Sequence, residues 1–185
     1  MIKLLSKLTI FVVVVIAIMI FLLFNYKDVI LKEIYPKKYS EYVNRYAKEY
    51  NVDDNLIYAI IKAESNFNQN AESHKNAKGL MQLMNSTAED VAKSMKINYN
   101  EKDLSKPDVN IKLGVKYISD LIIKYKSIEL ALAAYNAGSG KVDNWIKDKT
   151  LKEDGSNIEN IPYKETNNYV RKILRDYKIY KDIYV

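Results

Sequence analysis

An uncharged apolar run near the N-terminus, LTIFVVVVIAIMIFLLF at residues 8–24, restricts what this chain can fold into more than any other stretch. A helix of this sequence is apolar on every face, whereas a helix on the surface of a soluble core needs only one apolar face. At ~1.5 Å per residue it is about 25 Å long, slightly less than the hydrocarbon thickness of a bilayer. The run therefore predicts one transmembrane helix.

The same run could instead be a signal peptide that is cleaved. A signal peptide has a shorter apolar region, and small residues precede its cleavage site. The residues from Phe24 to Lys27 offer no such site, which favours an uncleaved signal anchor. A large domain is translocated largely regardless of charge. We therefore expect a cytoplasmic N-terminus at 1–7, a transmembrane segment at 8–24, a juxtamembrane linker at 25–38 and one extracytoplasmic domain at 39–185.

The composition excludes several classes of protein. The chain has no cysteine, which removes disulfides and thiol chemistry, and its only histidine, His74, is poor material for a transition-metal site. Glycine-rich nucleotide-binding motifs are absent. The net charge is +6, but the lysines are scattered among acids and only three arginines are present. We expect no metal, no cofactor and no nucleic-acid partner, and we expect His74 in an exposed loop.

Beyond the apolar run, apolar residues recur at helical spacing, and no segment shows the sustained alternation of a strand. The pattern predicts an all-α domain. Between the helices, residues 149–160 are polar and contain Gly155, so we expect a mobile surface loop there. The first predicted helix occupies residues 39–50, the next begins at Asp53 or Asp54, and the third begins at a Ser86–Glu89 capping box. The fourth begins at Pro107 and the fifth occupies residues 128–136. A further helix contains Trp145, and the last follows Pro162.

Glu64 stands where the helical spacing predicts an apolar residue. Ile57, Ile60 and Ile61 precede it by seven, four and three positions, so all four share one stripe. One interpretation is an exposed carboxylate at a frayed helix end. The other is a poorly hydrated carboxyl whose pKa is raised by burial, as a general acid near neutral pH requires.

Two other stretches place single polar groups among small or apolar residues. GLMQLM, at 79–84, surrounds Gln82 with leucine and methionine, and AAYNAGSG, at 133–140, surrounds Tyr135 and Asn136 with alanine and glycine. The first could be a core helix turn and the second a glycine C-cap. Alternatively, both could present polar side chains to a ligand, because alanine and glycine permit close backbone approach.

Taken together, these motifs resemble the soluble, family-1 lytic transglycosylases. The resemblance covers roughly residues 40–180 and implies a goose-type lysozyme-like (SLT) helical domain, here preceded by the transmembrane helix. The residues that carry it are Glu64–Ser65, Ser73, GLMQ at 79–82, NIKLGVKYI at 110–118, ALAAYNAGSGKV at 131–142 and IPYKETNNYV at 161–170.

The resemblance also implies a role for individual positions. Glu64 matches the sole catalytic acid/base of the family. Ser73 matches a serine near the muramoyl unit of the substrate, and Glu165 matches a position on its peptide side. The full set of implied substrate-binding residues is Ser73, Met81, Gln82, Tyr117, Tyr135, Asn136, Glu165 and Tyr169.

Three positions depart from the family pattern around the loop. His74 and Asn85 stand where the family often has proline, and Asn76 stands where it has glycine. Asparagine tolerates a left-handed backbone better than most residues, so the turn at Asn76 can survive. These departures affect the shape of the loop and leave the implied chemistry intact.

The implied function is a membrane-anchored peptidoglycan lytic transglycosylase of a bacterium, single-pass, with its catalytic domain facing the cell wall. Its partners would be the glycan strands and the membrane. It would cleave the bond between N-acetylmuramic acid and N-acetylglucosamine and leave a 1,6-anhydro end. A hydrolytic muramidase would use the same Glu64, and an inactive membrane-tethered glycan-binding or scaffold protein is a further alternative. A purely structural membrane protein would leave the polar motifs unexplained.

Overall fold

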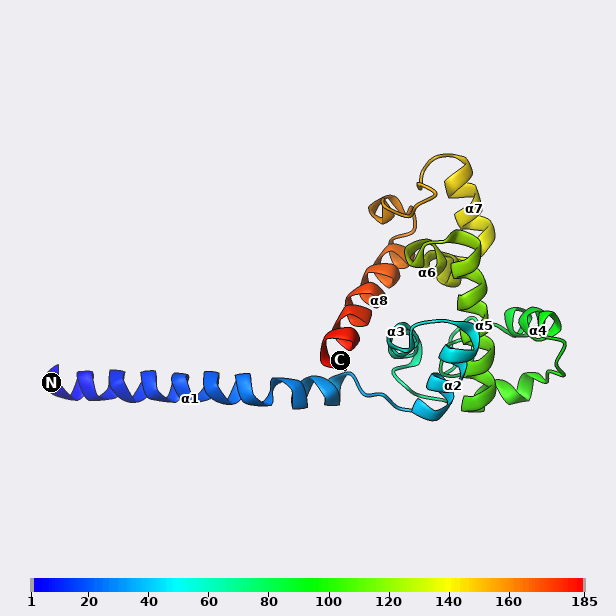
Figure 1. Cartoon of the computed structure of the whole chain (residues 1–185). Coiled ribbons are helices and arrows are strands. Elements are labelled where there is room, and N and C mark those ends of the chain that lie inside the picture. The colour runs from blue at the N-terminus through cyan, green and yellow to red at the C-terminus, as the bar shows by residue number, and fades with distance from the viewer. Residues whose placement is uncertain (1, 185) are drawn as a thin grey trace. The chain divides into compact units, whose positions relative to one another are not determined.

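The structure is a computed structural model that describes the backbone of residues 2–184 and the side chains of 9–22 and 25–184 (Figure 1). The chain divides into two compact units, one ending at Pro36 and one beginning at Lys37. Each unit is described separately below, because their mutual placement is not determined.

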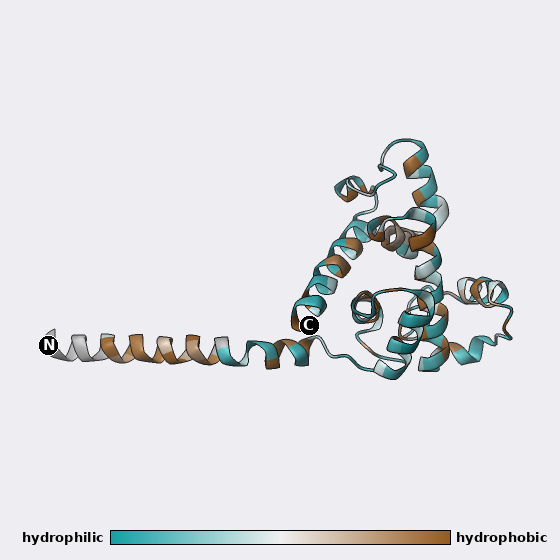
Figure 2. Cartoon of the chain, in the orientation of Figure 1, coloured by the Kyte–Doolittle hydropathy of each residue, from teal (hydrophilic) through white to brown (hydrophobic). Residues whose placement is uncertain are grey.

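The first unit consists of α1, Ile2–Ile34, which contains the predicted apolar run. Figure 2 shows the apolar residues as a continuous brown stretch of this helix, and the described side chains in it are exposed. In the described part of the chain no single helix has both the length and the hydropathy of a membrane span. The segments Thr9–Leu22 and Asn25–Ile34 meet at a bend of 55°. Together the two segments have the length and the hydropathy of a span, and by these two criteria they could cross a membrane.

The second unit is helical, as the sequence predicts. Short bridges pair Lys78 with Glu72 and with Leu83 in the loop after α3. The helices are α2 (Ser40–Tyr50), α3 (Asp54–Ser65), α4 (Asn85–Ser94), η1 (Glu101–Ser105), α5 (Pro107–Tyr125), α6 (Ile128–Ala137), α7 (Ser139–Lys147), η2 (Ile158–Asn160) and α8 (Lys164–Ile183).

Helix α3 is the centre of the core. Every residue from Leu56 to Ile61 is buried, so the apolar stripe inferred from the sequence covers the whole circumference of the helix. The helix packs against α2 and, most extensively, against α8. Its start is fixed by Asp53, whose carboxylate accepts hydrogen bonds from the Asn55 amide (2.9 Å) and from the Tyr177 hydroxyl of α8 (2.7 Å).

One local prediction was wrong. Helix α4 begins at Asn85 after Met84, so Ser86 lies inside the helix instead of capping it. Residues 149–160 lie mostly on the surface, as predicted, although Leu151 and Asn157 are buried. The Asn157 side chain also ties this segment together, accepting from the Lys152 amide (2.8 Å) and donating to the Thr150 carbonyl (3.2 Å).

Gly114 of α5 allows the loop after α3 to approach closely. A Cβ atom at Gly114 would lie 2.4 Å from Sδ and 2.9 Å from Cβ of Met81, whose side chain is fully buried. Helix α5 therefore has a notch into which Met81 fits, and this notch sets how near the loop lies to the helices.

We expect Gly114→Ala to lower the free energy of unfolding by about 1–3 kcal/mol, because the added methyl overlaps Met81 in a filled core. Gly140 of α7 is the matched control, since a Cβ there would meet nothing within 4 Å. Alanine at Gly140 should be neutral or stabilising by up to roughly 1 kcal/mol. Urea unfolding followed by circular dichroism measures both, and equal effects of the two substitutions would contradict the notch.

Candidate active site

Glu64 lies in the last turn of α3, three residues after the fully buried Ile61, and its side chain is partly buried. The turn is anchored by the next residue, Ser65, whose hydroxyl donates to the carbonyl of Leu80 (2.8 Å) in the loop. The Tyr169 hydroxyl of α8 donates a 2.6 Å hydrogen bond to Oε1 of Glu64. The carboxyl is thus held at the point where α3, α8 and the loop meet.

The environment of Glu64 decides between the two interpretations of its position. Burial raises the pKa of Glu64 to about 7, and the hydrogen bond from Tyr169 and the charge of Lys172 offset only part of this increase. The carboxyl is therefore poorly hydrated and holds its proton close to neutral pH. A residue with this pKa can both donate and accept a proton under physiological conditions.

Tyrosines line the same region. Burial raises the pKa of Tyr135 and that of Tyr169 well above the usual value, and the nearby charge of Glu64 acts in the same direction. Both phenols therefore stay protonated at neutral pH. The ring of Tyr117 from α5 packs against Tyr135 with centroids 5.1 Å apart. The hydroxyl of Tyr135 donates to the Met81 carbonyl (2.7 Å), so this tyrosine holds the loop.

Asn110 of α5 was missed as a site residue, although it opens the motif NIKLGVKYI. Its side chain is fully buried and makes three hydrogen bonds, accepting from the Met81 amide (2.8 Å) and donating to the carbonyls of Lys78 (2.9 Å) and Leu104 (2.8 Å). Gly79 has φ +80° and lies too close to Asn110 for any side chain. The signal available in the sequence was a polar residue on an apolar helix face.

Met81 and Gln82, the two residues predicted to form the loop wall, contact other residues of the domain. Met81 is fully buried, and Gln82 has a left-handed backbone with φ 47°. The Gln82 amide nitrogen donates to the carbonyls of Ala71 and Gly79, both at 3.0 Å. These bonds close the loop on itself, and contact of either residue with substrate stays a prediction.

The turn that carries Ser73 survives its departures from the family pattern. Asn76 adopts φ 60°, the left-handed conformation that the sequence required of it, and His74 is exposed. The Ser73 hydroxyl accepts from the amides of Ala77 (3.0 Å) and Lys75 (3.3 Å). Its proton stays available to another acceptor.

The remaining predicted residues lie on α6 and α8. Asn136, near the end of α6, is exposed and accepts a hydrogen bond from the Thr166 hydroxyl of α8 (2.7 Å), which joins the two helices. Glu165 is exposed in the first turn of α8. The structure therefore brings Glu64, Tyr169 and Tyr135 together, whereas Glu165 and Ser73 take no part in these contacts.

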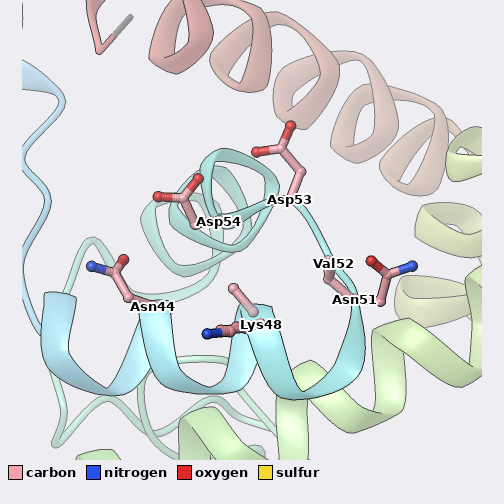
Figure 3. Close-up of a pocket in the computed structure, with 7 residues that line it drawn as sticks. Asn44, Lys48, Asn51, Val52, Asp53 and Asp54 are labelled. Carbon is pink, nitrogen blue, oxygen red and sulfur yellow. The ribbon is translucent and has the colours of Figure 1, made fainter.

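A pocket of about 470 Å³ lies at the opposite end of α3 from Glu64. Figure 3 shows Asp53 and Asp54 at the start of α3, and Asn44 and Lys48 on the neighbouring α2. Both carboxylates already have partners in the domain, since Asp54 pairs with Lys37 at 3.0 Å and Asp53 caps the helix. In the described part of the chain no three acidic, histidine or cysteine residues are grouped as a metal site requires. The pocket is thus separate from the Glu64 site.

Comparison with known proteins places this helical unit in a known family. The model of the transglycosylase SLT domain matches residues 41–158. The chain belongs to this family. The soluble lytic murein transglycosylase of Escherichia coli K12 is 32% identical over 148 residues, which cover 78% of this chain and 23% of that protein. A membrane-bound lytic murein transglycosylase C of Histophilus somni is 37% identical over 117 residues, covering 57% and 32%.

Solved structures agree with the family assignment. The lytic transglycosylase Slt of Pseudomonas aeruginosa, crystallised as an inactive Glu-to-Gln variant, has a TM-score of 0.75 and 36% identity over 82% of this chain and 25% of that one. The 70 kDa soluble lytic transglycosylase of Escherichia coli has a TM-score of 0.76 and 30% identity with the same coverage. The fold is therefore the all-helical, lysozyme-like SLT domain. The chain spans about a quarter of the length of these enzymes.

The raised pKa of Glu64 predicts a pH-dependent difference in stability between the wild type and Glu64→Gln. The folded state holds the proton up to about pH 7, whereas the free carboxyl loses it near 4.5, so ionisation destabilises the folded wild type as the pH rises through this window. Above pH 7 the variant should be more stable by up to roughly 3 kcal/mol, since one pKa unit corresponds to ~1.4 kcal/mol. Below pH 4.5 the advantage should vanish.

Denaturant unfolding at pH 4.5, 6 and 8.5 measures this difference. Glu165→Gln removes an exposed carboxylate from the same domain and serves as the control for the loss of one surface charge. A constant difference between Glu64→Gln and the wild type across this range would contradict the poorly hydrated state of Glu64.

Proposed function

We propose that this chain is a membrane-anchored lytic transglycosylase that cleaves peptidoglycan between N-acetylmuramic acid and N-acetylglucosamine. The observation that carries the proposal is Glu64, a carboxyl with a pKa of about 7 at the end of a buried helix, bonded to Tyr169. Membership of the SLT family supports it, as does the P. aeruginosa relative, which a glutamate-to-glutamine substitution inactivates.

The proposed reaction uses Glu64 twice. The protonated carboxyl first donates its proton to the glycosidic oxygen, and the bond from that oxygen to C1 of the muramoyl unit breaks. The N-acetyl group of the substrate stabilises the positive centre. The Glu64 carboxylate then removes the proton of the muramoyl 6-hydroxyl, whose oxygen bonds to C1. The 1,6-anhydro ring forms without water, and Glu64 is protonated again.

The surroundings of Glu64 suit both halves of this cycle. Burial favours the protonated form that starts the reaction. The hydrogen bond donated by Tyr169 stabilises the carboxylate that follows proton transfer. Ordinary glycosidases use two carboxyl groups, whereas the groups that shift the pKa of Glu64 here are a phenol and an ammonium. This favours a mechanism with one carboxyl.

The other predicted site residues would bind the glycan and its peptide. Ser73 would lie by the muramoyl unit, and Tyr117, Tyr135 and Asn136 would lie beside the catalytic carboxyl. Glu165 would face the peptide side, since it is exposed at the start of α8. Met81 and Gln82 would form the adjoining loop wall.

We expect Glu64→Gln to fold and to lose at least 10²–10⁴-fold in cleavage, the usual contribution of general acid–base catalysis. In the wild type, kcat/KM should fall as the pH rises through about 7, because the carboxyl then loses the proton that it must donate. Assays with purified peptidoglycan, followed by mass spectrometry of the released muropeptides, measure both.

The products distinguish the two chemistries. Anhydro products are lighter than hydrolysis products by one water molecule. If the products carry hydrated ends and no anhydro ends, Glu64 is still the catalyst but the chain is a muramidase. Full activity of Glu64→Gln would refute the site assignment.

The proposal places the catalytic domain outside the membrane, tethered by residues 8–24. The bent pair Thr9–Leu22 and Asn25–Ile34 supports a span by length and composition. We expect the protein in the membrane fraction to keep this segment, and N-terminal sequencing of that protein tests it. Replacing two apolar residues, Val14 and Ile18, with lysine should release the domain, since a lysine at the centre of a span costs about 3 kcal/mol. A mature N-terminus at or beyond residue 25 would show a cleaved signal peptide instead.

A further inference from the structure

Lys172 lies beside the candidate catalytic carboxyl without having a role in the proposed reaction. It follows Tyr169 by three residues on α8, so the two side chains share one face of the helix. Its Nζ donates to the carbonyl of Ala63 at 3.4 Å. Ala63 directly precedes Glu64 in the last turn of α3, where unpaired carbonyls carry the negative end of the helix dipole and attract a cation.

The groups that face Glu64 differ in charge. Tyr169 and Lys172 come from α8, Tyr135 comes from α6, and Tyr117 of α5 packs behind Tyr135. The tyrosines are neutral at physiological pH because burial raises their pKa. The loop meets the same turn through Leu80, which is apolar. Among these groups, the one that carries a whole charge and acts on the Glu64 carboxyl is therefore the ammonium of Lys172.

Other charges on the α3–α8 interface act elsewhere. The buried Asp176 accepts from Arg175 at 2.8 Å. Asp176 also stabilises the charged form of Lys62, whereas Arg175 and Lys172 repel it, and burial lowers the pKa of Lys62. Asp176 is thus engaged with Arg175 and Lys62, and Lys172 is directed at the end of α3.

We propose that Lys172 is a positioning residue for Glu64, which holds the last turn of α3 and favours the carboxylate that must form midway through the reaction. This inference rests on the proposed function for its catalytic consequence. The electrostatic coupling of Lys172 to Glu64, by contrast, can be measured whether or not the protein is active. Tyr169 stabilises the same carboxylate through a direct hydrogen bond, and Lys172 does so through its charge.

The opposing effects of burial and Lys172 would set the working pH. A carboxyl that is only buried keeps its proton to higher pH and is therefore a weaker acid, although its carboxylate is a stronger base. A nearby cation lowers the pKa of Glu64, which brings it towards the value at which one group serves as acid and base in turn. Because Lys172 is exposed, this attraction should weaken in salt.

The test compares three variants of the full-length protein in detergent. Lys172→Met removes the charge, Lys172→Arg keeps it, and Lys178→Met removes an exposed lysine further along α8 as a control for net charge. Carbon-13 NMR of glutamate side chains reports the pKa of Glu64, with the resonance assigned by its loss in Glu64→Gln. The alkaline limb of kcat/KM on peptidoglycan gives the kinetic counterpart.

In Lys172→Met at low ionic strength, the pKa of Glu64 and the midpoint of the alkaline limb should both rise by about half a pH unit, as expected for the loss of an exposed charge. In 0.5 M salt this increase should be less than about half as large, because salt screens the charge. Lys172→Arg and Lys178→Met should match the wild type. A merely structural role for Lys172 would lower kcat or stability without moving either value.

Two outcomes separate the failure of this inference from the failure of the proposed function. An unchanged pKa of Glu64 in Lys172→Met would overturn the inference, whatever the activity of the variant. A raised pKa in Lys172→Met, together with full activity of Glu64→Gln, would support the coupling between the two residues and refute the proposed catalytic role of Glu64.

Discussion

The burial of α3 is the constraint on which the rest of the domain depends. A helix whose residues from Leu56 to Ile61 are all inaccessible to water must be covered on every side. Helices α2 and α8 provide most of this cover, and α8 brings Tyr169 and Lys172 to the same end of α3. Because the buried stretch ends only three residues before Glu64, the packing that stabilises the fold also removes water from this carboxyl. Stability and reactivity are therefore coupled in one helix.

A second constraint is the loop between α3 and α4, whose shape does not depend only on its own buried residues, such as Leu80, Met81 and Leu83. Its geometry is fixed by hydrogen bonds from distant elements. Asn110 of α5 binds three backbone groups in and around it, and Tyr135 of α6 binds the Met81 carbonyl. These bonds provide partners for the Met81 amide and for the carbonyls of Met81, Lys78 and Leu104. The loop is thus tied to α5 and α6, which suits a binding wall that must be held in place.

Much of this organisation could be predicted from the sequence. The helical periodicity gave the elements of the domain, and Glu64 was identified because it interrupts an apolar stripe. Asn76 was expected to keep a left-handed turn, which the structure confirms. These inferences succeed because they depend on local spacing or on the preference of one residue, both of which are visible in a single sequence.

What escaped prediction depends on contacts between distant segments. The burial of Leu151 and Asn157 within the segment 149–160 requires a surface on which they can pack, and their polar neighbours concealed this burial. Ser86 has the composition of a capping residue, yet α4 starts earlier, which local preference alone does not specify. The role of Asn110 appears only once α5 lies beside the loop.

The same distinction explains why the pKa of Glu64 could be anticipated only in direction. The stripe indicated burial and hence an upward shift, but the size of the shift depends on what α8 places beside the carboxyl. Tyr169 lies 105 residues away in the chain and Lys172 contacts a residue 109 positions away. Burial, the phenol and the ammonium act with different signs, so none of them alone fixes the proton affinity. Burial outweighs the other two and leaves the pKa near 7, where a single glutamate can serve as acid and then as base, and the face that α8 turns towards α3 limits how far the pKa rises.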